Sequence, residues 1–441
     1  MIIKKKKLTI EETFNLAIKN HTEKKIDDAK YFYNQVLEIN PNYTAAHYNL
    51  GILFLSLKEY QKAKDCYKKA IKTNPNYAEA YNSLGSIFQI FNENQKAKDC
   101  YKKAIEINPN YILAYNNLGA IFQSLKENQK AKDCYKKAIE IDPNFARAHY
   151  NLGSLFKEIG EYHKAIDSFK NAKRIDPNLD YEVSIAETHL KDKNVEKALH
   201  SLESYLIKHP HDTKANAYKT IALRGLEKFH QVEKLIDFSN LVKKINIQIL
   251  TSEDMFEFNK ELRNVLVKDP RRCYEKNSSG WAIKGGTVIR NFFDTDNLLV
   301  AKFNIFLRKA IDHYITNLPD NDEHPFLMVK TKSYNIDNCW VNFLQQGDFQ
   351  SSHIHNNGWL SGVYYLDEPH IELNKEHAGW IEFNRTGHDL PHFAGEKGVE
   401  LIKPKAGMFI LFPSYIWHGT IPFTNKYSRI SISFDIRLNA D

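Results

Sequence analysis

The stretch QKAKDCYKKAI occurs three times in the chain, at residues 61–71, 95–105 and 129–139. Prolines keep the same 34-residue spacing before, between and after the copies: Pro41, Pro75, Pro109, Pro143 and Pro177, with Pro210 following after 33 residues. A constant period of this length is typical of stacked repeats, in which each unit buries its apolar face only against its neighbours. We therefore expect the first half of the chain to form a solenoid.

Within one repeat, the pattern predicts two helices. Apolar and small residues recur at helical spacing through YAEAYNSLGSIFQIF, the polar turn NENQ follows, and a second helix, AKDCYKKAIEI, ends at an Asn-Pro pair. The unit resembles the tetratricopeptide repeat, with Leu-Gly pairs at 50–51, 84–85, 118–119 and 152–153 and with Ala63, Ala97, Ala131 and Ala165 in the second helix. The resemblance covers about residues 8–210, as six units with degenerate ends. It implies a right-handed solenoid with a groove for a protein or peptide.

A polar position recurs just before the Leu-Gly pair, occupied by Asn49, Ser83, Asn117 and Asn151. In the similar superhelices of O-linked N-acetylglucosamine transferases, asparagines at this position hydrogen-bond the backbone of an extended peptide. The resemblance implies the same role here, and an amide side chain suits it because it offers both a donor and an acceptor. The alternative is that these side chains merely face water, and Ser83 interrupts the series.

Composition and charge exclude several classes of function. The chain has 441 residues, 42% of them hydrophobic, which is enough for two cores. Residues 1–243 hold 39 basic and 30 acidic residues (+9), whereas 244–441 hold 22 and 24 (−2), which together give the net charge of +7. The repeated lysines form a solvated face without the aromatic interleaving of nucleic-acid binders, so we expect no nucleic-acid partner.

The same inspection predicts a soluble cytoplasmic protein that does not bind a membrane. No apolar run is long enough to cross a bilayer, and the opening MIIKKKKLTI lacks the apolar segment of a signal peptide. The five cysteines form neither a disulfide framework nor a C-x-x-C metal motif, so they are expected to be small buried hydrophobic residues.

The repeat period fails from about residue 211 and the composition changes after Ile245. We predict a solenoid with capping helices over 1–243 and a second domain over 244–441. Two helices are expected at about 252–268 and 295–317. Short strands separated by Gly, Pro and Asn turns are expected at 326–336, 338–346, 358–367, 378–384, 398–413 and 428–437. Such a run indicates an antiparallel sandwich or barrel, and we predict a jelly-roll, or double-stranded β-helix. The fold class is therefore α+β multidomain.

Candidate metal ligands lie between two of these strands, in SSHIHNNGWLSGVYYL at 351–366. His353 and His355 are two residues apart, so in extended chain both imidazoles point the same way. His418 follows the strand MFILFP, and Arg429 and Ser431 lie on the last strand.

This order resembles the iron(II)- and 2-oxoglutarate-dependent oxygenases, whose pattern is H-x-(D/E), a distal histidine and then R-x-S. The resemblance implies that the histidines hold Fe(II) and that Arg429 and Ser431 hold the far carboxylate of 2-oxoglutarate. A guanidinium suits that carboxylate because it binds bidentately and keeps its charge. Asn342, on a neighbouring strand, is a further candidate contact of the cosubstrate. No side chain is assigned as a catalytic acid, base or nucleophile, because iron and the cosubstrate carry the chemistry.

The second ligand departs from the general pattern, since His355 stands where most of these oxygenases have Asp or Glu. The segments GDFQSSHIHNNGWLSGVYYL, FPSYIWHGTIPF and RISISFDIR resemble a bacterial group of these oxygenases whose own motif is H-x-H-P, with Asn356 here in place of the proline. This resemblance spans about residues 325–441. Whether His355 binds the metal, or Asp348 or water completes the shell, stays open from the sequence.

Three functions are compatible with this sequence. The first is a dioxygenase that hydroxylates a protein or peptide recruited by the repeats, with ascorbate as an optional reductant. The second is an oxygenase of a small molecule or glycan whose repeats serve self-association, so homo-oligomers are left open. The third is a non-catalytic repeat scaffold with a vestigial barrel. A zinc hydrolase is a weaker rival, because three histidines also suit Zn²⁺ but Arg429 and Ser431 would then have no role.

Overall fold

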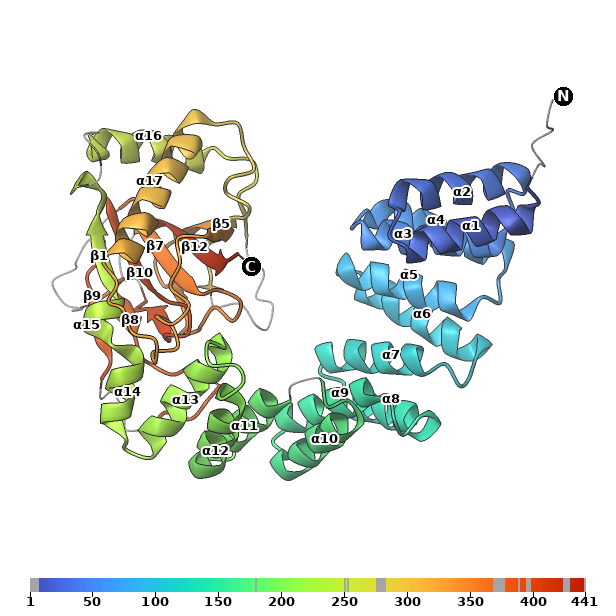
Figure 1. Ribbon diagram of the computed structural model, residues 1–441, viewed down its shortest axis with the longest axis horizontal. Coiled ribbons are helices and arrows are strands. Elements are labelled where there is room, and N and C mark those ends of the chain that lie inside the picture. The colour runs from blue at the N-terminus through green and yellow to red at the C-terminus, as the bar shows by residue number, and fades with distance from the viewer. Residues whose placement is uncertain are drawn as a thin grey trace. The chain divides into compact units, whose positions relative to one another are not determined.

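The computed structural model describes residues 8–178, 181–249, 251, 254–274, 283–367, 377–387, 389–393, 398–422 and 429–439. The chain forms two compact units, Met1–Tyr181 and Glu182–Asp441. The first unit is helical, and the second combines helices with antiparallel sheets (Figure 1).

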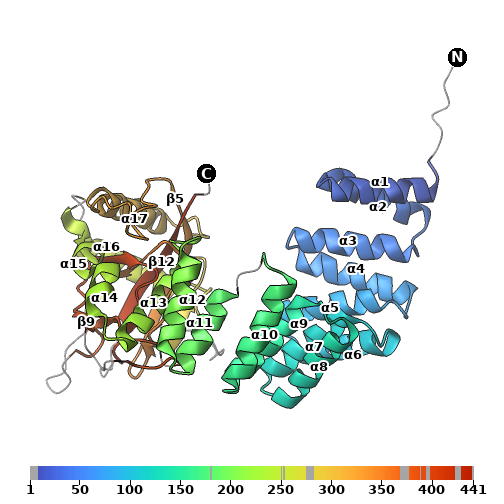
Figure 2. The same cartoon turned by 60° about the horizontal axis from the view of Figure 1, so that its bottom comes forward.

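The first unit is a stack of helix pairs, as Figures 1 and 2 show. Each helix packs against its partner in the pair and against the next pair. The helices are α1 (Ile10–Thr22), α2 (Ile26–Ile39), α3 (Thr44–Ser56), α4 (Tyr60–Thr73), α5 (Ala78–Ile90), α6 (Asn94–Ile107), α7 (Ile112–Ser124), α8 (Asn128–Ile141), α9 (Ala146–Glu158) and α10 (Tyr162–Ile175).

The repeated residues explain why the two helices of a pair lie so close. A Cβ added to Gly119 in α7 would lie 2.6 Å from Cε1 of Tyr135 in α8, so only glycine leaves room for that ring. Tyr135 and Ala131 are fully buried on the same face of α8. The same packing recurs in every central pair, with Phe169 replacing the tyrosine in the last one. The glycine of each Leu-Gly pair and the tyrosine of the following QKAKDCYKKAI segment therefore pack directly against each other.

The second unit contains seven α-helices and twelve short strands in its described part. The helices are α11 (Glu182–Lys191), α12 (Val195–Leu206), α13 (Thr213–Gly225), α14 (Phe229–Ile236), α15 (Phe238–Leu241), α16 (Met255–Val267) and α17 (Leu298–Thr316). The strands are β1 (Lys243–Asn246), β2 (Cys273–Tyr274), β3 (Ile283–Lys284), β4 (Thr287–Ile289), β5 (Tyr334–Leu344), β6 (Phe349–Gln350), β7 (Leu360–Tyr365), β8 (Ile381–Phe383), β9 (Glu400–Ile402), β10 (Met408–Pro413), β11 (His418–Thr420) and β12 (Arg429–Leu438).

The strands form one large antiparallel sheet and two small ones. The large sheet has the order β1-β10-β7-β12-β5-β4-β2, and the small sheets are β11-β8-β9 and β3-β6. β12 is buried along most of its length and lies between β7 and β5, so its side chains on one face point into the interior of the jelly-roll. This placement puts Arg429 and Ser431, two of the predicted cosubstrate contacts, on a buried central strand.

The unit boundary lies earlier than the one expected at 243/244, because the last repeat-like helices pack on the β-domain. Trp417 donates its Nε1–H to the Ala217 carbonyl of α13 (3.2 Å), and Tyr415 donates its hydroxyl to the Leu235 carbonyl of α14 (2.6 Å). One continuous hydrophobic core runs from Ala186 to Ile436. α11–α15 therefore belong to the same packed body as the sheets.

The helices predicted for residues 244–441 are present, but one of the predicted strands is not. The two predicted helices are confirmed as α16 and α17, but the strand predicted at 326–336 is wrong over most of its length, since β5 begins at Tyr334. Phe326 lies in a turn and stacks on Trp359, with ring centroids 4.7 Å apart, so a tertiary contact replaces the expected strand pairing.

The described residues contain neither a candidate membrane-spanning helix nor a disulfide. No helix in them is long and apolar enough to cross a bilayer. All five cysteines are free, and Cys273 is exposed, which corrects the expectation that every cysteine is buried. Burial raises the pKa of the Cys66 thiol to about 11, as expected of an unreactive core residue.

Candidate metal and cosubstrate site

Three histidines from distant parts of the chain meet at one edge of the barrel. His353 follows β6 and pairs with His418, the first residue of β11, through two backbone hydrogen bonds of 2.9 and 3.0 Å. Their ring centroids are 4.3 Å apart. His355, two residues further, donates its backbone N–H to the Ser414 carbonyl (3.1 Å). The backbone hydrogen bonds between the segment that holds His353 and His355 and the segment that holds His418 therefore fix the backbone positions from which all three imidazole side chains project.

Backbone carbonyls fix the protonation of two of the rings. The Nδ1–H of His353 donates to the Ser351 carbonyl (2.8 Å), and the Nδ1–H of His418 donates to the Ile416 carbonyl (3.0 Å). A carbonyl only accepts, so Nδ1 carries the proton in both rings. Both Nε2 atoms consequently present a lone pair.

His355 completes the cluster. Its Nε2 lies 3.1 Å from Nε2 of His353 and 3.1 Å from Nε2 of His418, while its Nδ1 lies 2.6 Å from Oδ1 of Asp435. Two nitrogens bound to one ion at about 2.1 Å and a right angle would be about 3.0 Å apart. Two of the Nε2–Nε2 distances match this spacing and all three ligand atoms lie within 4.8 Å of one another, so the cluster could hold a divalent metal ion.

Burial keeps the imidazoles of His353 and His418 neutral. It lowers the pKa of His353 to about 3, with a smaller contribution from the neighbouring His355, and it lowers the pKa of His418 well below its usual value. The neutral ring is the form that binds a metal ion.

Aromatic rings form the wall around the histidines. Trp340 on β5 stacks on His355, with ring centroids 5.7 Å apart and an interplanar angle of 22°. Phe412 lies 4.5 Å from His418 between ring centroids. Trp417 lies almost parallel to Tyr218 of α13, with ring centroids 6.4 Å apart. The helix α13 thus supports the residue adjacent to a candidate ligand, a contact that no sequence pattern indicated.

The residues expected to hold 2-oxoglutarate lie on β12 and β5. Arg429 and Ser431 share one face of β12, and Ser431 is paired in register with Asn342 of β5 and with Tyr365 of β7. The Arg429 guanidinium is 2% exposed, lies over the Tyr365 ring at 5.2 Å, and donates to the Gly379 carbonyl. Burial lowers the pKa of Arg429 from its usual value, while Tyr365 and Asp367 act in the opposite direction.

Buried polar atoms near these residues suit a polar ligand. Asn342 is fully buried and donates its Nδ2–H to Ser433 (2.9 Å), but its Oδ1 has no partner among the described residues. The Nε1 atom of Trp380, the residue after Gly379, is also buried without a hydrogen-bond partner among the described residues. Leaving such groups unpaired is costly, so a ligand that hydrogen-bonds them would be stabilised.

Asp348, the alternative third ligand, does not join the histidine cluster. Its Oδ2 accepts the Gln345 backbone N–H (2.7 Å), so it closes the turn between β5 and β6. The carboxylate that lies beside the cluster is that of Asp435, which was not identified as a site residue from the sequence. The alternation in RISISFDIR could have revealed it, since Arg429, Ser431, Ser433 and Asp435 share one face of β12.

Three of the four residues predicted to line a groove make contacts between neighbouring repeats. Asn117 donates its Nδ2–H to Oδ1 of Asn82 (3.0 Å), and Asn151 does the same to Asn116 (2.9 Å). Ser83 makes a longer contact with the Tyr48 hydroxyl at 3.5 Å. Asn49, Ser83, Asn117 and Asn151 are half-buried. Each of these two bonds uses one Nδ2 hydrogen of the donating asparagine.

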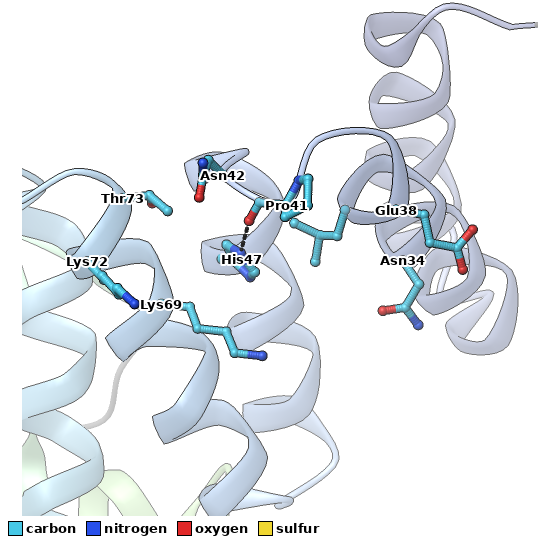
Figure 3. A pocket seen from close by; sticks show the side chains of 9 residues that line it. Asn34, Glu38, Pro41, Asn42, His47, Lys69, Lys72 and Thr73 are labelled. Carbon is cyan, nitrogen blue, oxygen red and sulfur yellow. Dashed lines mark hydrogen bonds between the residues drawn. The ribbon is translucent and has the colours of Figure 1, made fainter.

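A separate cavity of about 860 Å³ lies in the first unit, where α2, α3 and α4 meet (Figure 3). His47 lies on its wall and donates Nε2–H to the Pro41 carbonyl (2.8 Å), and Lys69 and Lys72 come from α4. None of the four predicted groove residues lines this cavity.

Known proteins match both halves of the chain. Residues 44–77, 78–111, 112–145 and 134–167 match tetratricopeptide repeat families, and residues 338–435 match the family described as "Putative 2OG-Fe(II) oxygenase". The chain thus matches tetratricopeptide repeat families over residues 44–167 and this oxygenase family over residues 338–435. The oxygenase match includes the three histidines, Arg429 and Asp435. No curated protein matches the chain.

Solved structures match the repeats. The MamA protein is 30% identical, with 38% of this chain and 92% of that chain covered and a TM-score of 0.34. YrrB, a tetratricopeptide protein with an unusual peptide-binding site, is 23% identical over 42% of this chain and 95% of its own, with a TM-score of 0.35. A thermophilic tetratricopeptide protein from Thermus thermophilus is 21% identical over 41% of this chain and 100% of its own, with a TM-score of 0.36.

Proposed function

We propose that the protein is an Fe(II)- and 2-oxoglutarate-dependent dioxygenase that hydroxylates a protein or peptide recruited by its repeats. The observation that carries the proposal is the convergence of three Nε2 atoms, from His353, His355 and His418, with two of the rings held as Nδ1–H tautomers by backbone carbonyls. The match of residues 338–435 to the oxygenase family supports the identity of the metal and cosubstrate.

Each proposed residue has a separate task. His353, His355 and His418 would hold iron(II) through their Nε2 atoms. When bound, iron(II) with 2-oxoglutarate and dioxygen supplies the oxidation of a C–H bond to an alcohol, while 2-oxoglutarate becomes succinate and carbon dioxide.

Arg429, Ser431 and Asn342 orient the cosubstrate. A buried guanidinium binds a carboxylate through two parallel N–H···O bonds, and the Ser431 hydroxyl, two residues along the same face, adds a donor. The low exposure of this strand face excludes water, which strengthens the ionic contact.

Turnover of the cosubstrate tests the enzymatic part. The full chain with Fe(II), 2-oxoglutarate and ascorbate should release succinate, at least slowly without a substrate, and should bind Fe(II). His353→Ala and His418→Ala should lower metal affinity by at least about 100-fold, since outer-shell changes alone cost 10–100-fold. His392→Ala is the control, because that side chain is exposed. No iron binding and no succinate would leave only a repeat scaffold, and preferential Zn²⁺ binding with hydrolytic activity would support the rival enzyme.

A second experiment tests the substrate class. Proteins cross-linked to the full chain should be enriched in one partner that gains a single oxygen atom in the presence of Fe(II) and 2-oxoglutarate. Asn117→Ala with Asn151→Ala should reduce this capture while succinate release without a substrate is kept. If the double variant captures and hydroxylates as well as the parent, the asparagine positions do not bind the peptide. Hydroxylation of a small molecule or glycan alone would instead favour the second hypothesis.

A further inference from the structure

A carboxylate lies directly behind one of the three candidate ligands. Asp435, on β12, places Oδ1 2.6 Å from Nδ1 of His355, on the side of the ring opposite the Nε2 atom that faces the other histidines. Asp435 is 8% exposed. A short, buried contact of this kind is a charge-assisted hydrogen bond in which the ring N–H donates.

His355 differs from the other two ligands in this partner. His353 and His418 donate their Nδ1–H groups to backbone carbonyls, which are neutral. His355 donates to a carboxylate, and His355 is also the residue at which the chain departs from the H-x-(D/E) pattern. The carboxylate missing from the ligand set is therefore present one hydrogen bond further out.

Asp435 is itself held in place. The Ser361 hydroxyl donates to the same Oδ1 atom (2.8 Å), and the Ser361 and Ser414 hydroxyls are 2.7 Å apart. The Ser414 carbonyl accepts the backbone N–H of His355 (3.1 Å), which closes the loop of contacts. Both serines are buried, so the carboxylate has little freedom to turn away from the ring.

We infer that Asp435 is a positioning residue that holds His355 as the Nδ1–H tautomer with Nε2 toward the metal, and that it supplies from behind the negative charge which the usual carboxylate ligand supplies directly. This inference rests on the proposed metal site. Carboxylates behind metal-bound imidazoles fix ring orientation and raise ligand basicity, and their loss costs about 10–100-fold in metal affinity or activity. The geometry assigns that role to Asp435 and makes Ser361 its support.

Cobalt(II) titration of the full chain, followed by the visible absorption of the bound ion, tests this role. Asp435→Asn keeps the shape and an acceptor but removes the charge, and should weaken Co²⁺ binding about 10–100-fold and shift the visible bands. Asp348→Asn is the matched control, since it removes a charge from a nearby turn outside the histidine cluster, and should bind Co²⁺ like the parent. Thermal unfolding without metal checks that each variant is folded.

A double-variant cycle separates positioning from a merely structural role. His355→Asp puts a carboxylate directly at the ligand position and removes the ring that Asp435 holds. In that background Asp435→Asn should change Co²⁺ affinity by less than about threefold, because coupled residues lose their mutual effect when one is removed. An equal loss in both backgrounds would overturn the inference, as would a folded Asp435→Asn protein that binds Co²⁺ like the parent.

The two proposals fail in different ways. A parent protein that binds neither Co²⁺ nor Fe²⁺ overturns the metal site and the proposed function with it. A parent that binds the metal while Asp435→Asn binds it equally well overturns only the role of Asp435.

Discussion

At the scale of single residues, the site is defined by which atom of each side chain is already engaged. His353 and His418 use Nδ1 to donate to carbonyls, so Nε2 remains for a cation. Arg429 is buried on the same strand face as Ser431, where a guanidinium is costly unless an anion or carbonyls surround it. The proposed metal and cosubstrate contacts therefore rest on the geometry of these polar atoms.

The binding of 2-oxoglutarate gives a prediction at this scale. Arg429→Lys keeps the positive charge but loses the planar pair of donors, so the apparent KM for 2-oxoglutarate should rise by roughly 10–100-fold, the equivalent of one hydrogen bond to a charged group. The measurement is succinate release against cosubstrate concentration.

Arg437→Lys provides the comparison for that measurement. Arg437 lies on the same strand but its side chain is half exposed and pairs with Asp337 at 2.9 Å, a type of contact that contributes little. The apparent KM of the Arg437→Lys variant for 2-oxoglutarate should stay within about twofold of that of the parent. If both variants behave alike, Arg429 does not bind the cosubstrate.

At the scale of elements, the last repeat-like helices act as part of the barrel wall. α14 ends beside a segment that leads into β5: the Nε2–H of His324 donates to the Leu235 carbonyl (3.1 Å), and the Phe326 backbone N–H donates to its Nδ1 (3.2 Å). A ring that donates at one nitrogen and accepts at the other is neutral. Burial lowers the pKa of His324, in agreement with this arrangement.

This contact predicts a dependence of stability on pH. Because the pKa of His324 is lower in the folded state than the ordinary 6.5, the unfolded state binds more protons below pH 6.5, and stability falls as the pH falls. The full contribution is present above pH 6.5. Each tenfold change in proton concentration contributes at most about 1.4 kcal/mol for one group.

The variant His324→Gln isolates this contribution from that of the other buried histidines. Its unfolding temperature, measured between pH 5 and 8, should fall less steeply on acidification than that of the parent. Exposed His392→Ala should follow the parent curve. Parallel curves for His324→Gln and the parent would show that His324 does not take up a proton on unfolding.

At the scale of the whole molecule, the chain divides by packing and not by repeat number. The period of the prolines continues to Pro210, yet the compact unit that holds the barrel begins at Glu182. α13 provides the carbonyl that fixes Trp417, and Arg224 on the same helix donates to the Asn384 carbonyl (2.8 Å). The helices α11–α13, whose sequence still follows the repeat spacing, therefore pack as part of the barrel domain.

Two fragments test this division. Residues 182–441 should unfold cooperatively and bind Co²⁺ as the full chain does, because they keep the continuous core. Residues 244–441 should aggregate or unfold without cooperativity, since removing α11–α15 exposes Trp417, Tyr415 and the core beneath them. Circular dichroism melting and Co²⁺ titration give the readouts. A stable, metal-binding 244–441 fragment would place the boundary where the composition changes.

The sequence alone determined the features that repeat or follow a local pattern. A 34-residue period, the Leu-Gly pairs and the small alanines specify the helix stack, because each unit needs only its neighbours to bury its apolar face. Arg429 and Ser431 could be placed on one face of the last strand, and His353 and His355 between two strands with both side chains pointing the same way, because alternation in extended chain fixes the face of each residue.

Only the tertiary structure decided what depends on contacts between distant segments. Asp435 lies 80 residues after His355, and Ala217 lies 200 residues before Trp417, so no local pattern links either pair. The failed strand at 326–333 has the same origin, because Phe326 finds its partner in Trp359 and not in a neighbouring strand. Side-chain packing across the barrel, which local propensity does not specify, set the carboxylate partner of His355 and the extent of the second compact unit.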